Sequence, residues 1–204
     1  EAQQIAEAFT GSKIEQTFAE RLTSLTAHRG GRLQVATLEM EESFRREASN
    51  WRGTTTSEVR VPAVYHYFVP LDGEWRVEAR VGEGIASCFV VAPSLEPVLP
   101  VGIRTSELER QSSRGWLRWD KDEEMDALIA SITPELEARA ANNALLAREQ
   151  ARLAVADFIR TWLLEEEHWR TDRFSAIQVV FANEAADSSR DLQFEPTLII
   201  EAKP

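Results

Sequence analysis

Residues 134–165 read PELEARAANNALLAREQARLAVADFIRTWLLE, and this stretch decides the fold class because it predicts one long amphipathic helix. Thr133 can accept hydrogen bonds from the open amides of a first turn, and Pro134 has the fixed φ angle suited to the first helical position. We therefore expect the helix to begin at Pro134, where Glu135 and Glu137 would complement its positive end. At ~1.5 Å per residue it would measure roughly 45 Å, more than most sheets are wide. Part of it is expected to project or to meet another chain.

The inward face of this predicted helix changes character along its length. Its first half presents alanines at spacings of three and four, which lets another backbone approach closely. Its second half presents large apolar side chains that are expected to cover a sheet. The small positions are Ala140, Ala144, Ala147, Ala151 and Ala154, and the large ones are Val155, Phe158, Ile159, Trp162 and Leu163.

The middle of the chain predicts an antiparallel sheet. Residues 59–69 alternate in a pattern typical of a strand. The Asp-Gly pair at 72–73 is a strong signal for a tight hairpin, and residues 75–81 alternate again after it. We expect the two strands to pair with each other.

Further strands are predicted later in the chain. Residues 85–92 form a continuous apolar run that is expected near the middle of the sheet, and residues 82–84 are interpreted as the hairpin turn before it. Residues 176–181 and 192–200 are β-rich and are separated by a polar turn at 183–191. They predict a closing hairpin.

The N-terminal segment is predicted to be helical. Apolar residues recur at spacings of three to five over residues 1–26, and Gly11 is a point where this helix could break. Gly30 and Gly31 permit the positive φ angles of a turn into a strand that begins near Arg32.

A polar, Ser-rich loop is predicted over residues 105–118, and a shorter helix after it. Asp120 and Glu123 have capping-box spacing, and an apolar stripe continues to Ile132. Together these elements predict a single α+β domain over residues 1–204. It consists of a mainly antiparallel sheet packed against a long C-terminal amphipathic helix, with the shorter helix before it and a helical N-terminal segment at 1–30.

Composition excludes some classes of function. The chain has 34 acidic and 23 basic residues, a formal charge of -11, and its arginines are interspersed with carboxylates, so no nucleic-acid partner is expected. No run approaches the ~20 apolar residues of a membrane span. The chain starts at Glu1 without a methionine, and we expect a further segment upstream.

Four segments, taken in order, resemble a known family. They are residues 33–39 (LQVATLE), the strand ending at 89–93 (FVVAP), the helical 147–152 (AREQAR) and the strand 177–181 (IQVVF). They resemble the family called domain of unknown function 4230, bacterial proteins with a short N-terminal membrane anchor and one α+β domain. The resemblance implies membrane association through a segment upstream of Glu1 and no established activity. The side of the membrane stays open, with the extracytoplasmic side slightly favoured.

A Trp- and Arg-rich segment is the most suggestive surface candidate for contact with a partner or ligand. Residues Arg114, Trp116, Arg118 and Trp119 lie in the predicted loop, and Trp and Arg are favoured as binding anchors. The alternative is that these tryptophans only seal the edge of a core.

No catalytic, cofactor-binding or metal-ligating residue is assigned. Cys88 and His66 are the one thinkable thiol and imidazole pair, but Cys88 lies among apolar residues and is expected to be buried and unreactive. The three histidines are widely separated and have no metal motif around them, and no cofactor is expected.

Three functions remain open at this point. The leading hypothesis is a non-enzymatic, membrane-tethered protein-interaction or scaffold domain that binds a protein partner or another copy of itself. The alternative is a module that holds a small or lipid-like ligand between sheet and helices, suggested by Trp75, Trp116, Trp119 and Trp162. A hydrolase assembled from distant residues is the third, and it would require His66 to meet a carboxylate and a nucleophile in one cleft.

Overall fold

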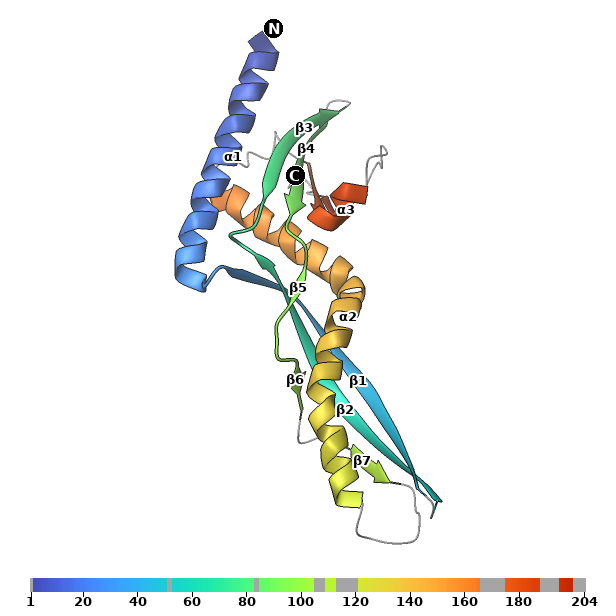
Figure 1. The fold of residues 1–204 in the computed structure, drawn as a ribbon. Coiled ribbons are helices and arrows are strands. Elements are labelled where there is room, and N and C mark those ends of the chain that lie inside the picture. Colours follow the sequence, from blue (N-terminus) through green and yellow to red (C-terminus); the bar gives the residue numbers. More distant parts are fainter. Residues whose placement is uncertain are drawn as a thin grey trace. The chain divides into compact units, whose positions relative to one another are not determined.

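The computed structural model describes residues 2–50, 53–82, 85–104, 109–112, 121–165, 175–187 and 195–199, and it confirms the α+β fold class (Figure 1). The chain divides into two compact units. Unit 1 consists of Glu1–Ala36, Tyr67–Glu96 and Arg148–Pro204, and unit 2 consists of Thr37–His66 and Pro97–Ala147. The single domain expected from the sequence stays a prediction.

Unit 1 contains a four-stranded sheet. Its order is β3 (Arg76–Gly82), β4 (Ile85–Ala92), β8 (Ala176–Phe181) and β9 (Leu198–Ile199). The apolar run that predicted an interior strand is β4, which has a neighbour on each side. The register places Gly82 opposite Ile85 in an antiparallel pair, and residues 83–84 of the predicted turn lie outside the described residues.

The C-terminal strands agree with the prediction in pairing but differ in their connection. β8 and β9 pair antiparallel as expected, with Ala176 opposite Ile199. The segment between them, predicted as a polar turn, begins with the short helix α3 (Ala182–Asp187). β8 also pairs in parallel with β4, a contact between segments far apart in the sequence.

The predicted hairpin at residues 72–73 is wrong. The backbone does turn there, since the Gly73 amide donates to the Pro70 carbonyl at 3.4 Å. However, the strand before the turn, β2 (Gly53–Pro70), and the strand after it, β3, belong to different sheets. Gly73 is needed for a different reason, because a Cβ at this position would approach Pro93 Cγ to 2.7 Å.

The N-terminal helix α1 (Ala2–Arg29) is continuous, so the expected break at Gly11 is absent. A glycine within a helix costs only about 1 kcal/mol, which the rest of the helix can offset. Gly30 and Gly31 adopt φ angles of 69° and 73°, as predicted, and β1 (Arg32–Asn50) follows them directly.

The long helix is longer than predicted. α2 (Lys121–Glu165) contains Pro134 in its interior, so the helix start expected at this residue is wrong and the shorter helix expected before it is its first part. Pro134 lacks the amide that would bond one turn back, a cost of about 3 kcal/mol. Ile132 and Leu136 on either side are both buried, and their burial favours an uninterrupted helix.

Both units of the chain contain part of α2. Ile132, Leu136 and Ala140 are buried in unit 2, and Val155 and Leu163 are buried in unit 1. The predicted inward face is therefore confirmed, and the expectation that part of the helix projects or meets another chain stays a prediction.

The second sheet contains β1, β2, β5 (Glu96–Pro97), β6 (Gly102–Ile103) and β7 (Glu109–Ser112). β1 and β2 are neighbours joined by two residues, and so short a connection requires an antiparallel pair. β6 and β7 both pair antiparallel with β2. The loop predicted over residues 105–118 therefore includes a strand, since Ser57 to Arg60 of β2 lie opposite β7.

Candidate functional site

A groove in unit 1 lies beside α1. It has a volume of about 1310 Å³ and is lined by α1, by the 71–75 turn and the start of β3, and by Val91 of β4 and Ala182 of α3. Figure 1 shows α1 beside β3, on the side away from β4, and the two elements are in contact. The lining residues of α1 recur at helical spacing and so form one face of the helix. They are Glu15, Phe18, Ala19, Leu22, Thr23, Thr26 and Ala27.

Two aromatic residues of the groove lining, Phe18 and Trp75, belong to an aromatic cluster. The ring of Phe18 lies 5.7 Å from that of Trp75 and 4.8 Å from that of Trp162, both edge to face. Phe158 completes the cluster, 6.4 Å from Trp75. The Trp75 indole donates to the Pro70 carbonyl at 3.0 Å, which holds the ring against the turn. This cluster joins α1, the turn and α2, and edge-to-face pairs add about 0.5–1.5 kcal/mol each to the apolar burial.

The rim of the groove is acidic. Four carboxylates line it, from Glu15, Asp72, Glu74 and Glu78, against the single guanidinium of Arg76. Glu15, Asp72 and Glu74 are exposed to solvent. The rim therefore presents an excess of negative charge above an apolar floor.

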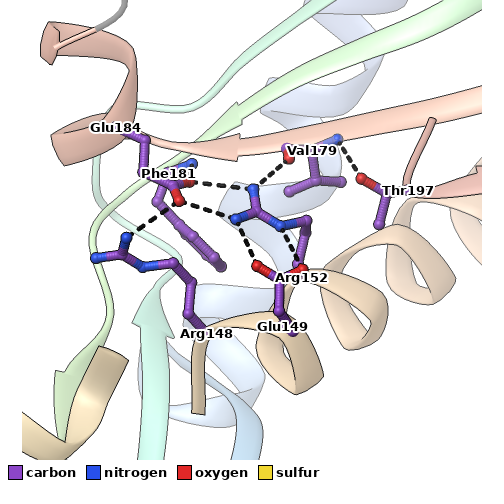
Figure 2. Close-up of polar contacts among 7 residues, drawn as sticks. All are labelled: Arg148, Glu149, Arg152, Val179, Phe181, Glu184 and Thr197. Carbon is purple, nitrogen blue, oxygen red and sulfur yellow. Dashed lines mark hydrogen bonds and ion pairs between the residues drawn. The ribbon is translucent and has the colours of Figure 1, made fainter. Parts of the chain in front are cut away.

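The densest polar cluster of unit 1 is centred on Arg152 of α2 (Figure 2). Its guanidinium donates to both carboxylate oxygens of Glu184 at 2.8 and 3.1 Å, and to both of Glu149 at 3.1 and 3.2 Å. It also donates to the Val179 carbonyl at 2.8 Å. A guanidinium has five N–H donors, and all five are used. Arg152 is therefore a structural clamp between α2, β8 and α3, with no donor left for a substrate.

Glu184 is the acceptor that organises this cluster. It lies in the first turn of α3 and reaches back to the Phe181 amide at 2.9 Å, the backbone contact of a capping box. Arg148 adds a second guanidinium at 3.3 Å. Burial alone would raise the pKa of Glu184, but the hydrogen bonds from Arg152 and Phe181, with the attraction of both arginines, lower it below its usual value. The carboxylate is thus held ionised.

This cluster was not predicted from the sequence, although two of the segments that form it were. The helical 147–152 segment and the strand at 177–181 were both noted, and the structure brings them together through the Arg152 contact with Val179. Glu184 was interpreted as part of a polar turn. The available signal was its position three residues after the end of a strand, where it can cap a short helix.

Unit 2 contains a buried carboxylate with its own partners. Glu42 of β1 is 9% exposed, accepts from the Tyr65 hydroxyl at 2.8 Å and forms an ion pair with Arg139 of α2. The Arg139 guanidinium also lies over the Phe44 ring, 4.4 Å from its centroid. These contacts pair the buried charge and join β1, β2 and α2, which is a structural role.

Arg114, Trp116, Arg118 and Trp119, the surface candidate from the sequence, lie outside the described residues. Of the four tryptophans that suggested a ligand pocket, Trp75 lines the groove, and both Trp75 and Trp162 contact the Phe18 ring.

Cys88 and His66 lie in different units. Cys88 is 1% exposed, as predicted, and burial raises the pKa of its thiol to about 12. His66 has its Nδ1 3.0 Å from the Thr37 hydroxyl. Neither the groove beside α1 nor a smaller hollow of about 180 Å³ near Arg104 includes these two residues.

Comparison of the chain with protein-family models, with curated proteins and with solved structures finds no match. In the part of the chain that the structure describes, no helix is long and apolar enough to cross a membrane. Among the same residues, no three His, Cys, Asp or Glu side chains are grouped as a metal site would require.

Proposed function

We propose that this chain is a non-enzymatic protein-interaction module and that the groove beside α1 receives a segment of a partner polypeptide. The observation that carries the proposal is the groove itself. It combines about 1310 Å³ of open volume with an apolar floor and an acidic rim. Small-molecule sites are usually enclosed and occupy about 300–1,000 Å³, so an open groove of this size is better suited to a polypeptide segment.

The charge of the rim favours a protein partner over the lipid-like ligand considered as the alternative. An acyl chain would fit the floor formed by Phe18, Leu22 and Trp75, but an anionic headgroup would meet the carboxylates of Glu15 and Glu74. A polypeptide can place apolar side chains on the floor and basic side chains at the rim, because its side chains differ along its length.

The polar clusters support a role without catalysis. Arg152 and Glu42 have charged partners within their own unit, so both clusters are accounted for by the stability of the fold. The membrane tether belongs to the proposal through the family resemblance, and the side of the membrane stays open. Fractionation of cells that express the complete gene tests the tether, and recovery in the membrane fraction is the expected result.

The test of the groove is a peptide selection with matched variants. Ala19 lines the groove and is exposed, so Ala19→Trp should fill it without disturbing the core. Gln16 is exposed on the same helix and does not line the groove, so Gln16→Trp is the control. The probe is a phage-displayed library of random linear peptides, selected on the unmodified chain.

Selected peptides are expected to bind the unmodified chain and Gln16→Trp and to lose binding to Ala19→Trp. If no peptide is enriched, or if the enriched peptides bind Ala19→Trp equally well, the groove is not an interaction site. A fluorescent fatty acid tested on the same three proteins should not bind, and groove-dependent binding of it would favour the ligand-binding alternative instead.

A further inference from the structure

Strand β1 is an outer strand of the sheet in unit 2, which contains its residues Thr37–Asn50. β2 lies on one side of it, and among the described residues no strand pairs with its other side. Figure 1 shows β6 and β7 beyond β2, and no described element of unit 2 beyond the lower half of β1. The backbone N–H and C=O groups of an outer strand can pair with an added chain, so this side of β1 can accept another strand.

This strand lacks most of the features that protect an outer strand from pairing. It has 19 residues, whereas strands usually have about 3–10, and it contains neither proline nor glycine. Arg139 of α2 contacts Glu42 and Phe44, whose side chains stand on a face of the sheet, so α2 packs over that face rather than along the edge. Charged side chains are the remaining protection. Their order along the strand therefore decides whether a second strand is repelled or attracted.

The charges on the exposed face of β1 change sign along the strand. Glu41, Ser43 and Arg45 are exposed and alternate with the buried Glu42 and Phe44, so they share one face. If two copies of β1 pair antiparallel with Ser43 opposite Ser43, each Glu41 lies opposite Arg45 of the other copy. Opposite charges that face each other across a strand pair stabilise the pair. This part of β1 is therefore complementary to itself.

The present contacts of these charged side chains allow such pairing. Glu41 lies 3.9 Å from Arg60 of β2, and the two side chains are 70% and 49% exposed. An exposed pair of this kind contributes little, so the Glu41 carboxylate can accept a second guanidinium. Arg45 pairs with Glu47 at 2.7 Å, and its five N–H donors can serve a carboxylate of another copy as well.

One pair of like charges works against this register. Glu39 of one copy lies opposite Glu47 of the other. Within its own chain, Glu39 forms an ion pair with Arg104, and Glu47 forms one with Arg45. Because each carboxylate keeps a guanidinium of its own, their repulsion is reduced.

From the uncovered edge and its self-complementary charges, we infer that a second copy of this chain binds along β1. The two unit 2 sheets then join into one antiparallel sheet about a two-fold axis at Ser43. In a symmetric dimer the same surface serves both copies, so a single charge pattern has to complement itself. The surface lies in unit 2 and the groove beside α1 lies in unit 1, so this inference goes beyond the proposed function and does not depend on it.

Charge reversal at two positions tests the pairing. Glu41→Arg gives the exposed face two arginines, and Arg45→Glu gives it two glutamates, so each variant alone is expected to be monomeric. A mixture of the two variants should form a mixed dimer, because each arginine then lies opposite a glutamate. Sedimentation velocity at roughly 100 µM detects a dimer with a Kd in the micromolar range, and the unmodified chain is expected to be a dimer there.

Two further variants are matched controls. Glu20→Arg and Arg160→Glu make the same changes in net charge at exposed positions of α1 and α2, and both should stay dimeric. A monomeric unmodified chain, or a mixture of the Glu41 and Arg45 variants that stays monomeric while circular dichroism shows both folded, would overturn the inference. Equal weakening by the control variants would show an effect of net charge rather than pairing at β1.

Cross-linking tests the position of the two-fold axis and uses no charge reversal. Two opposed Ser43 residues would have Cα atoms about 4.5–5.5 Å apart, a separation that suits a disulfide, so Ser43→Cys should form a covalent dimer on mild oxidation. Glu47→Cys is the control, because its two copies would lie eight residues apart along the strands, roughly 26 Å. Both variants keep Cys88, which is 1% exposed. Equal cross-linking of the two variants, or none at position 43, would contradict the proposed dimer.

Discussion

Replacing Arg152 with methionine removes the guanidinium that joins α2 to β8 and α3 and keeps a side chain of similar length. The Val179 carbonyl then loses the Arg152 donor, and Glu184 keeps its contacts with Arg148 and the Phe181 amide. A hydrogen bond to a charged group contributes about 1.5–3 kcal/mol, and an unsatisfied buried acceptor costs about 1–3 kcal/mol. Since Arg148 offsets part of the loss, we expect the free energy of unfolding to fall by roughly 2–4 kcal/mol.

Arg160→Met is the matched control, because it makes the same change on the same helix. Arg160 pairs with Asp157 at 2.8 Å, but their side chains are 44% and 58% exposed, whereas those of Arg152 and Glu184 are 13% and 14% exposed. An exposed pair contributes about 0–1 kcal/mol. The assay is urea denaturation followed by circular dichroism. If the two variants lose the same stability within about 0.5 kcal/mol, the clamp described around Arg152 is wrong.

Three further predictions concern pH, packing and thiol reactivity. The pKa of Glu184 is lower in the folded chain than in the unfolded chain, so its ionised form stabilises the fold above about pH 4.3 and this contribution is lost as the pH falls further. The stability difference between the unmodified chain and Glu184→Gln should therefore shrink on acidification, and a constant difference would contradict the assigned shift. Leu163→Ala, at a fully buried position, should cost about 2–5 kcal/mol, whereas Leu153→Ala, at a position 52% exposed, should cost under about 1 kcal/mol in the same denaturation assay. Cys88 should react with an aromatic disulfide reagent only in denaturant, because its buried thiol has a pKa of about 12, and rapid reaction in the native state would refute its burial.

The errors in predicting the strands have a common physical origin. The Asp-Gly signal at 72–73 correctly predicts a turn, since the Gly73 amide bonds to the Pro70 carbonyl. Turn chemistry is local and does not specify which sheet the next strand joins. Here β2 and β3 belong to different sheets, and the glycine is required by the approach of Pro93. The parallel pairing of β4 with β8 depends on long-range contacts that no local pattern encodes.

For the long helix, the local sequence pattern predicted the buried face correctly but the position of the helix start wrongly. The inward face of α2 was predicted well because a repeat of 3.6 residues is encoded over many positions. The cap signal at Thr133 and Pro134 failed because a single proline competes with burial on both sides of it, at Ile132 and Leu136. The division of the chain into two units, each containing part of α2, was not visible in the sequence.

The candidate site could be predicted only in fragments. Phe18 and Leu22 belong to the apolar stripe seen in the N-terminal segment, and Trp75 was noted as a possible ligand contact. The groove exists because α1, the turn at 71–75 and β3 meet in space, and their separation in sequence hides that meeting. The acidic residues of its rim are separated in the sequence, and the chain as a whole is acidic, so composition alone did not identify them.

Hydrogen–deuterium exchange with and without a peptide selected on the unmodified chain tests the central claim most directly. If a partner segment occupies the groove beside α1, amides of residues 71–78, which line it, should exchange more slowly in the complex. β9, at the far edge of the unit 1 sheet, should be unchanged. Protection at β9 or elsewhere with none at residues 71–78, or no change at saturating peptide, would contradict the proposal that this groove binds a partner protein.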